Sequence, residues 1–138
     1  MSKGWVIDSS VGFGWIHADQ ATPETDRLLA ELESGGVMVV PAFWFLEIAN
    51  TVLSLQRRRK MTREERKYAL ATLSRMNLTI DVESGNAAFH KISELAEEYG
   101  LSIYDAVYLE VALRRGLALA SRDRALVSAA KKCGVQVL

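Results

Sequence analysis

The stretch LSIYDAVYLEVALRRGLALASRDRAL, residues 101–126, decides the fold of this chain. It predicts a helix, a tight turn, a short strand and the start of another helix. Ser102 suits the helix N-cap, and Gly116 suits the position after the helix end because glycine accepts a left-handed conformation. The apolar run 117–120 is typical of a buried strand. A helix followed at once by a short buried strand favours an α/β fold.

Asp105 is the unusual residue of this stretch. At helical spacing it shares a face with Leu109 and Ala112, and that face is expected to be buried. A carboxylate on an apolar face is unfavourable unless a cap, a cation or a metal ion compensates it. Ser121 and Asp123 follow the predicted strand, at the edge of a parallel sheet where ligands bind.

The rest of the chain repeats the alternation of helix and short apolar strand. The predicted strands are residues 5–7, 37–40, 78–80 and 135–138, and the predicted helices are 22–34, 43–59, 83–99 and 122–133, with another beginning at Thr62. Thr22 and Pro23 form a clear helix start, and glycine follows most of the helices. This pattern predicts an α/β sandwich with a mainly parallel sheet in a single domain, residues 1–138.

Asp8 lies at the carboxyl end of the first predicted strand, where Ser9 or Ser10 is expected to cap a short helix. An equal alternative is that Asp8 is itself only a helix cap. The nearby Gly12 and Gly14 do not form a phosphate-binding loop, because the dinucleotide and P-loop signatures are both absent.

Helix 43–59 is apolar around most of its circumference, which predicts a buried helix. Its narrow polar stripe consists of Glu47, Asn50, Thr51 and Ser54. This stripe faces either solvent or a polar site. Asn50 lies one turn from Glu47 and would suit a partner that orients a carboxylate.

One dense basic segment follows this helix. It comprises Arg57, Arg58, Arg59, Lys60 and Arg63, with Arg66 and Lys67 beyond it. One interpretation is a solvated helical hairpin, in which cations stabilise the end of the first helix. The other is a surface that contacts the phosphate backbone of a nucleic acid.

Composition narrows the function classes. The 138 residues carry no net charge, so nucleic-acid binding would have to come from a local patch. The single Cys133 cannot form an internal disulfide, which fits a reducing cytoplasm. No run is long and apolar enough for a membrane span, and Asp8 interrupts the first apolar segment too early for a signal peptide. We therefore expect a cytoplasmic protein without membrane contact.

Four acids occupy positions that a parallel sheet can bring together at one edge: Asp8, Glu47, Asp105 and Asp123. Clustered carboxylates repel, so a cation must be present or some must be protonated. Oxygen ligands suit Mg²⁺ or Mn²⁺, and such a site suits metal-assisted phosphodiester hydrolysis.

The sequence lacks the residue patterns of a histidine metal site, a cysteine-rich zinc site and a serine hydrolase. His17 and His90 have no metal-ligand spacing, a single cysteine excludes a cysteine-rich zinc site, and no G-x-S-x-G elbow is present.

The order of these pieces resembles the PIN-domain family, and in particular the VapC-type toxins of prokaryotic toxin–antitoxin pairs. The matching segments are VIDSSV (6–11), FLEIAN (45–50), LSIYDAVYLEVA (101–112), LASRDRAL (119–126) and CGVQV (133–137). They span essentially the whole chain. The D-A-x-Y and S-R-D-x-x-L segments are the most specific, and the order and separation of all the segments carry the resemblance.

The resemblance implies a three-layer α/β/α sandwich around a mainly parallel twisted sheet, and an Mg²⁺- or Mn²⁺-dependent endoribonuclease that cuts tRNA or rRNA. It implies that Asp8, Glu47, Asp105 and Asp123 form the catalytic and metal-binding site, supported by Ser9, Asn50 and Ser121, where Ser121 replaces the threonine common in the family. The basic segment would hold RNA backbone.

The resemblance also implies partners: a cognate VapB-like antitoxin that covers the site, and a second copy in a homodimer. Phe43, Trp44 and Phe45 would suit such a surface, although core packing is the simpler interpretation for at least two of them.

Three alternatives belong to other classes. The first is a non-catalytic PIN-like module that binds RNA or protein; the four retained acids argue against it. A phosphoacceptor receiver domain needs an acid after a central strand, where this chain has Pro41-Ala42. A haloacid-dehalogenase-like phosphatase needs D-x-D, and position 10 is serine.

Overall fold

The computed structural model describes residues 4–138 and is built on a four-stranded parallel sheet in the order β3-β2-β1-β4. The strands are short: β1 (Trp5–Ile7), β2 (Met38–Pro41), β3 (Thr79–Asp81) and β4 (Ala118–Ala120). The two central strands are almost wholly buried, as expected for a parallel sheet covered on both faces.

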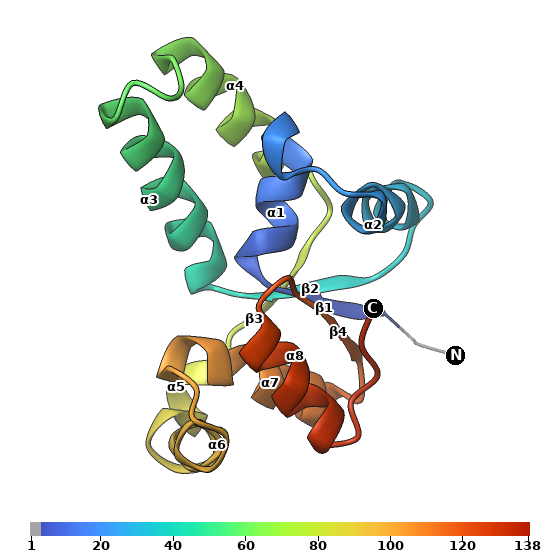
Figure 1. Cartoon of the computed structure of the whole chain (residues 1–138). Helices are drawn as coiled ribbons and strands as arrows, with labels where there is room; N and C mark the ends of the chain where they lie inside the picture. The colour runs from blue at the N-terminus through green and yellow to red at the C-terminus, as the bar shows by residue number, and fades with distance from the viewer. Residues whose placement is uncertain (1–3) are drawn as a thin grey trace.

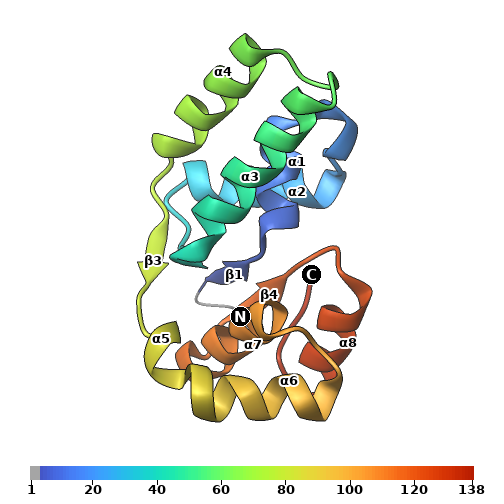
Figure 2. The ribbon, with the colours of Figure 1, turned by 90° about the vertical axis from the view of Figure 1, so that its left-hand side faces the viewer.

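Helices cover the sheet on two sides. They are α1 (Ser9–Ile16), α2 (Pro23–Glu33), α3 (Phe43–Arg57), α4 (Arg63–Ser74), α5 (Ser84–Ala87), α6 (Ser93–Tyr99), α7 (Ile103–Arg115) and α8 (Arg124–Lys132), with a 3₁₀ turn η1 (Ala18–Gln20) and a π-helical turn η2 (Ala88–Ile92). Helices α1 to α4 lie above the sheet in Figure 1, and α5 to α8 lie below it, as Figure 2 also shows. The expected three-layer α/β/α sandwich is confirmed.

The register brings the carboxyl ends of three strands to one edge. Val6 pairs with Val39 on one side and with Leu119 on the other. The residue after β1, Asp8, therefore lies level with the end of β4, and its amide donates to the carbonyl of Ala120 at 3.2 Å. This edge is where ligands bind in open parallel sheets.

Local signals predicted most helix ends correctly. Thr22 and Thr25 cap α2 reciprocally, and Pro23 is its first residue. The Ser102 hydroxyl accepts the Asp105 amide at 3.0 Å at the start of α7. Gly116 ends that helix at φ 64°, a conformation that disfavours any side chain with a Cβ atom.

The predicted strand at 135–138 is wrong in extent. Only one bridge forms, between Val137 and Leu119. The amide of Val135 is used instead to close the end of α8, because it donates to the Ala130 carbonyl at 2.9 Å.

Helix α3 is buried on one face only, contrary to the expectation of an all-round buried helix. Trp44, Ile48 and Val52 are buried, whereas Leu46 is 72% exposed. The reason is that α3 and α4 form a hairpin that extends away from the sheet (Figure 1).

Among the described residues, no helix is both long enough and apolar enough to cross a bilayer.

The two glycines of α1 allow close helix packing. A Cβ atom on Gly12 would lie 2.6 Å from the Ile48 side chain and from the Trp44 ring of α3. A Cβ atom on Gly14 would lie 2.6 Å from the Thr25 side chain of α2. Both positions therefore need glycine for packing between helices, in agreement with the absence of a phosphate loop.

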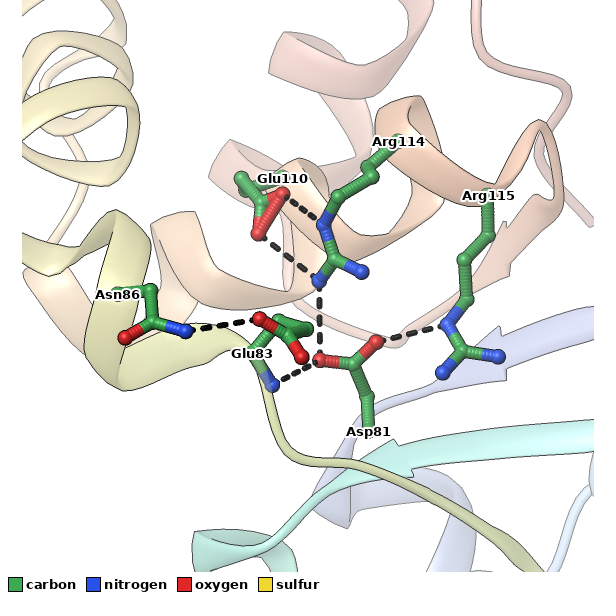
Figure 3. A network of polar contacts seen from close by, with 6 residues as sticks. All are labelled: Asp81, Glu83, Asn86, Glu110, Arg114 and Arg115. Carbon is green, nitrogen blue, oxygen red and sulfur yellow. Dashed lines mark hydrogen bonds and ion pairs between the residues drawn. The ribbon is translucent and has the colours of Figure 1, made fainter.

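A second acidic centre, outside the predicted site, lies at the end of β3. Asp81 is fully buried and accepts hydrogen bonds from Arg114 Nη2 at 2.9 Å and Arg115 Nε at 2.7 Å. Arg114 also pairs with the buried Glu110 at 2.8 Å. Figure 3 shows this network, which ties β3 to the end of α7. Burial raises the Asp81 pKa, but the hydrogen bonds from Arg114 and Arg115 outweigh burial and lower it to about 2.

The Asp81 centre predicts a pH-dependent stability. A carboxyl whose pKa is lower in the folded state than in the unfolded state stabilises the fold above the unfolded pKa, and this contribution is lost as the pH falls towards about 2. We expect Asp81→Asn to lower the free energy of unfolding by about 2 kcal/mol at pH 7, with a smaller difference from wild type below pH about 3. Urea denaturation at several pH values measures this effect. Glu97→Gln, at an exposed position of α6, is the control; equal stability of wild type and Asp81→Asn at pH 7 would contradict the prediction.

Candidate functional site

Asp8 is the most enclosed carboxylate of the predicted site, with 6% of its surface exposed. It is the N-cap of α1 and accepts the Ser10 amide at 3.1 Å. The Ser10 hydroxyl donates to its Oδ1, and the Ser121 hydroxyl donates to its Oδ2. Those hydroxyls accept in turn from backbone amides after β4: Ser10 from Arg122 at 3.1 Å, and Ser121 from Asp123 at 2.9 Å. Asp8 is thus fixed from both β1 and β4.

The helix cap expected at Ser9 or Ser10 is provided by Asp8 instead, because its side chain reaches the amide two residues on. Ser10, and not the predicted Ser9, shares a hydrogen bond with Asp8. Within the described part of the chain, the Ser9 side chain makes no hydrogen bond to this carboxylate. The hydroxyl of Ser121, the other serine predicted to support the site, does donate to Asp8.

Glu47 lies half-buried on the side of α3 that faces α7. Its Oε1 accepts a hydrogen bond from the Tyr108 hydroxyl at 2.6 Å. Tyr108 is 1% exposed, and its ring packs edge-on against Phe43 at 5.6 Å between ring centroids. The tyrosine therefore fixes one oxygen of Glu47 from a rigid position in the core.

Asp105 and Asp123 lie at helix starts. Asp105 is half-buried in the first turn of α7, and Asp123 is the exposed N-cap of α8, where its Oδ1 accepts the Leu126 amide at 2.9 Å. With Asp8 at the start of α1, three acids lie at helix N-termini. The partial positive charge of those ends makes negative charge more favourable there.

Negative charges within this group raise the pKa values of two of its members, Glu47 and Asp105. Burial raises the pKa of Asp8. Burial also raises the pKa of Glu47, and the negative charges of Asp8 and Asp105 raise it further. Burial and the charge of Asp123 raise the pKa of Asp105. Within the described residues, no positive side chain is among the groups that shift these values, and the contributions that lower them are hydrogen bonds.

The donors fit a hard divalent cation in chemistry and in charge. They are carboxylate oxygens, which Mg²⁺ and Mn²⁺ prefer, and a cation would offset both the burial and the repulsion. In residues 4–138, however, no three side chains of His, Cys, Asp or Glu are grouped closely enough to hold a metal ion. The acids are therefore close enough to shift one another's pKa values but too far apart to coordinate one metal ion as they stand.

The remaining predicted residues lie outside this cluster. Asn50 is exposed on α3. The basic segment is exposed at the far end of the α3–α4 hairpin (Figure 2). Ten residues of α3 separate Glu47 from Arg57, which corresponds to about 15 Å along the helix axis. Of the three aromatic residues at the start of α3, Trp44 is buried, and Phe43 and Phe45 are half-buried.

Sequence reasoning did not assign Ser10, Tyr108 or Arg122 to the site. A signal existed for Ser10, since an aspartate cap accepts from the amide two residues on. Tyr108 lies in the D-A-x-Y segment, one turn after Asp105, but only the packing of α3 on α7 brings Glu47 to its hydroxyl. The contacts of Arg122 had no sequence signal.

The hydrogen bond from Tyr108 lowers the pKa of Glu47, against the effects of burial and like charges. We therefore expect Tyr108→Phe to raise the Glu47 pKa further, because the charged form loses a donor. NMR titration of the carboxyl carbons in metal-free protein measures this shift. Tyr104→Phe is the matched control, because Tyr104 contacts the same Phe43 ring without bonding to Glu47. An unchanged Glu47 pKa in Tyr108→Phe would show that the bond has no electrostatic role.

Known structures share this fold. The PAE2754 protein from Pyrobaculum aerophilum superposes with a TM-score of 0.70 at 21% identity, over 97% of this chain and 83% of that chain. VapBC2 from Rickettsia felis, bound to a DNA fragment from its promoter, gives 0.66 at 13% identity, over 97% and 96%. FitAcB from Neisseria gonorrhoeae gives 0.63 at 18% identity, with the same coverage. These likenesses establish the fold.

A search of curated protein sequences gave no significant match. The family profile named PIN domain matches residues 5–132, which include every strand and helix described above. The chain therefore belongs to the PIN domain family.

Proposed function

We propose that this protein is a metal-dependent endoribonuclease of the VapC toxin type. The observation that carries the proposal is the arrangement of four acids, Asp8, Glu47, Asp105 and Asp123, at the carboxyl edge of the sheet. Three of them have raised pKa values, and among residues 4–138 no positive side chain contributes to the shifts. Such a cluster is unfavourable by itself and favourable with a bound cation. Membership of the PIN family supports the same conclusion.

The four acids have different proposed roles in binding Mg²⁺ or Mn²⁺. Asp8 and Asp105 are the main ligands in this proposal, and Glu47 and Asp123 complete the set directly or through water. When bound, the ion lowers the pKa of a water molecule and stabilises negative charge on the scissile phosphate. The Tyr108 hydroxyl donates to Oε1 of Glu47 and so orients this carboxylate in the site.

Neighbouring hydroxyls orient these acids. Ser10 and Ser121 each hold one oxygen of Asp8, so the carboxylate cannot rotate freely. Ser9 and Asn50 remain proposed supporting residues on the exposed side of the site. Fixed carboxylates lower the cost of organising a metal site, and partners of this kind affect metal affinity strongly.

The substrate is RNA, with tRNA or rRNA as the expected target. The basic segment (Arg57, Arg58, Arg59, Lys60 and Arg63) is exposed at the hairpin end and is the proposed contact for the phosphate backbone. Backbone contacts of this kind position a nucleic acid without reading its sequence.

Two protein partners belong to the proposal. The structures of VapBC2 and FitAcB, by their names, hold complexes, and we infer by analogy that a VapB-like antitoxin binds this chain over the acidic site. A second copy of the chain is the other proposed partner, in a homodimer.

One observation favours a second candidate, a non-catalytic PIN-like module that binds RNA or protein. No metal-binding group of three acidic, histidine or cysteine side chains is present among residues 4–138. In that case the acids would persist without a cation, despite their mutual repulsion. Metal binding distinguishes the two candidates.

The direct test is an incubation of the purified, partner-free protein with total tRNA and rRNA in Mg²⁺, Mn²⁺ or EDTA, beside Asp8→Asn. Discrete fragments that require metal and are absent with the variant support the nuclease and identify its target class. Folded protein that neither cleaves RNA nor binds Mn²⁺ in a calorimetric titration would support the binding module instead.

Asp105→Asn separates metal binding from folding. The substitution removes one charge that is repelled by Asp123, so metal-free protein should unfold at a temperature equal to or above that of wild type. RNA cleavage should fall at least about a hundredfold, and Mn²⁺ should no longer stabilise the fold, because a ligand is lost. Thermal scans with and without Mn²⁺, together with cleavage assays, measure these effects. Wild-type activity in the variant would refute the assignment.

A further inference from the structure

A pocket of about 570 Å³ lies between α1, η1 and the outer half of α3. This size is in the range of small-ligand sites. Phe13 and Leu55 provide apolar walls, and the polar groups come from His17, Asp19, Gln20, Thr51 and Lys60. None of these side chains belongs to the acidic cluster, so the pocket is distinct from the candidate site, although both involve helix α3. We name it the α1–α3 pocket.

The pocket adjoins the acidic cluster along α3. Thr51 is one turn beyond Glu47, and Leu55 is one turn further, so the pocket begins about 6 Å along the helix axis from Glu47. Lys60 at its outer end belongs to the basic segment. The pocket therefore lies between the acidic cluster and the proposed backbone contact.

A second connection runs through Arg122. Its Nη1 donates to the carbonyl and to the side-chain oxygen of Gln20, at 2.8 and 3.1 Å. Its backbone amide donates to the Ser10 hydroxyl, which holds Asp8. One residue thus links the rim of the pocket to the most enclosed acid of the site. The two connections are independent, because one follows a helix and the other follows the loop after β4.

The lining matches the requirements of a nucleobase. An unstacked base needs an aromatic or apolar surface for its ring and polar groups for its edge. Phe13 and Leu55 supply the first, and Thr51 and Gln20 supply the second. His17 adds a ring at the wall, and its Nδ1 atom accepts the Asp19 amide at 3.3 Å.

We propose that the α1–α3 pocket binds one unstacked nucleotide of a single-stranded RNA, with its base against Phe13 and its phosphate towards Lys60. In the context of the proposed nuclease, on which this part rests, that nucleotide adjoins the phosphodiester held at the acidic cluster. The pocket then restricts cleavage to unpaired RNA, because a base inside a duplex cannot enter it.

The first experiment needs no catalysis. Uridine, cytidine, adenosine and guanosine 5′-monophosphates are titrated separately into the full-length protein in EDTA, with amide chemical shifts as the readout. At least one nucleotide should shift the signals of Thr51 and Gln20 in a saturable manner. The absence of saturable shifts at the pocket with all four would overturn the proposal.

The second experiment fills the pocket. Thr51→Tyr adds a ring at the wall, and Ala71→Tyr adds the same ring at an exposed position of α4 as the matched control. Affinity for a short single-stranded RNA of mixed sequence is measured in EDTA by fluorescence anisotropy. Thr51→Tyr should weaken binding about tenfold, in the range for losing one stacked base, while Ala71→Tyr stays near wild type. Matching thermal transitions establish that both variants fold.

Cleavage separates this proposal from the proposed function. If wild type binds nucleotides in the pocket but does not cleave RNA with metal, the nuclease fails and the pocket stands. If wild type cleaves and Thr51→Tyr binds and cleaves like Ala71→Tyr, the pocket proposal fails and the nuclease stands. If both proposals hold, Thr51→Tyr raises KM with little change in kcat. If Thr51→Tyr binds RNA like wild type but no longer binds a protein partner, the pocket binds protein and the proposal is overturned.

Discussion

The enclosure of the Asp8 carboxylate is the constraint on which the site depends. Parallel pairing of β1 with β4 places Asp8 beside the loop after Ala120, and the hydroxyls of Ser10 and Ser121 then hold both of its oxygens. The amides of the loop after β4 hold those hydroxyls in turn. A buried carboxylate is tolerated only with such hydrogen bonds. The strand pairing and the local geometry of the acid therefore support each other.

Asp8 and Asp81 are both buried, but their pKa values are shifted in opposite directions. Asp81 meets two arginine side chains, and its pKa is lowered to about 2. Asp8 meets hydroxyls and an amide, and burial raises its pKa against the effect of these hydrogen bonds. The first arrangement neutralises a charge within the protein and ties β3 to α7. The second leaves the carboxylate without an arginine partner among its hydrogen-bond donors, which is compatible with the proposed metal site.

The α3–α4 hairpin brings together the features proposed to act on RNA. Its inner end carries Glu47, its middle lines the α1–α3 pocket, and its outer end carries the basic segment. Gly12 allows α1 to pack closely on α3, and α1 provides the opposite side of the pocket through Phe13. Glu47, the pocket and the basic segment thus follow one another along α3 and the turn after it, an order suited to the proposed binding of a strand of nucleic acid.

The sequence by itself determined the alternation of helices and strands, the parallel α/β class and most helix ends, because caps and apolar periods are local signals. It also indicated which acids follow strands, and the resemblance connected them to one family. Only the tertiary structure decided that α3 is exposed on one side, that Ser10 bonds to Asp8 and that Tyr108 bonds to Glu47. It also decided that Arg114 and Arg115 compensate Asp81, 33 and 34 residues earlier in the chain. Such contacts join residues distant in sequence, and their geometry is set by how whole elements pack, for which a single sequence carries no local signal.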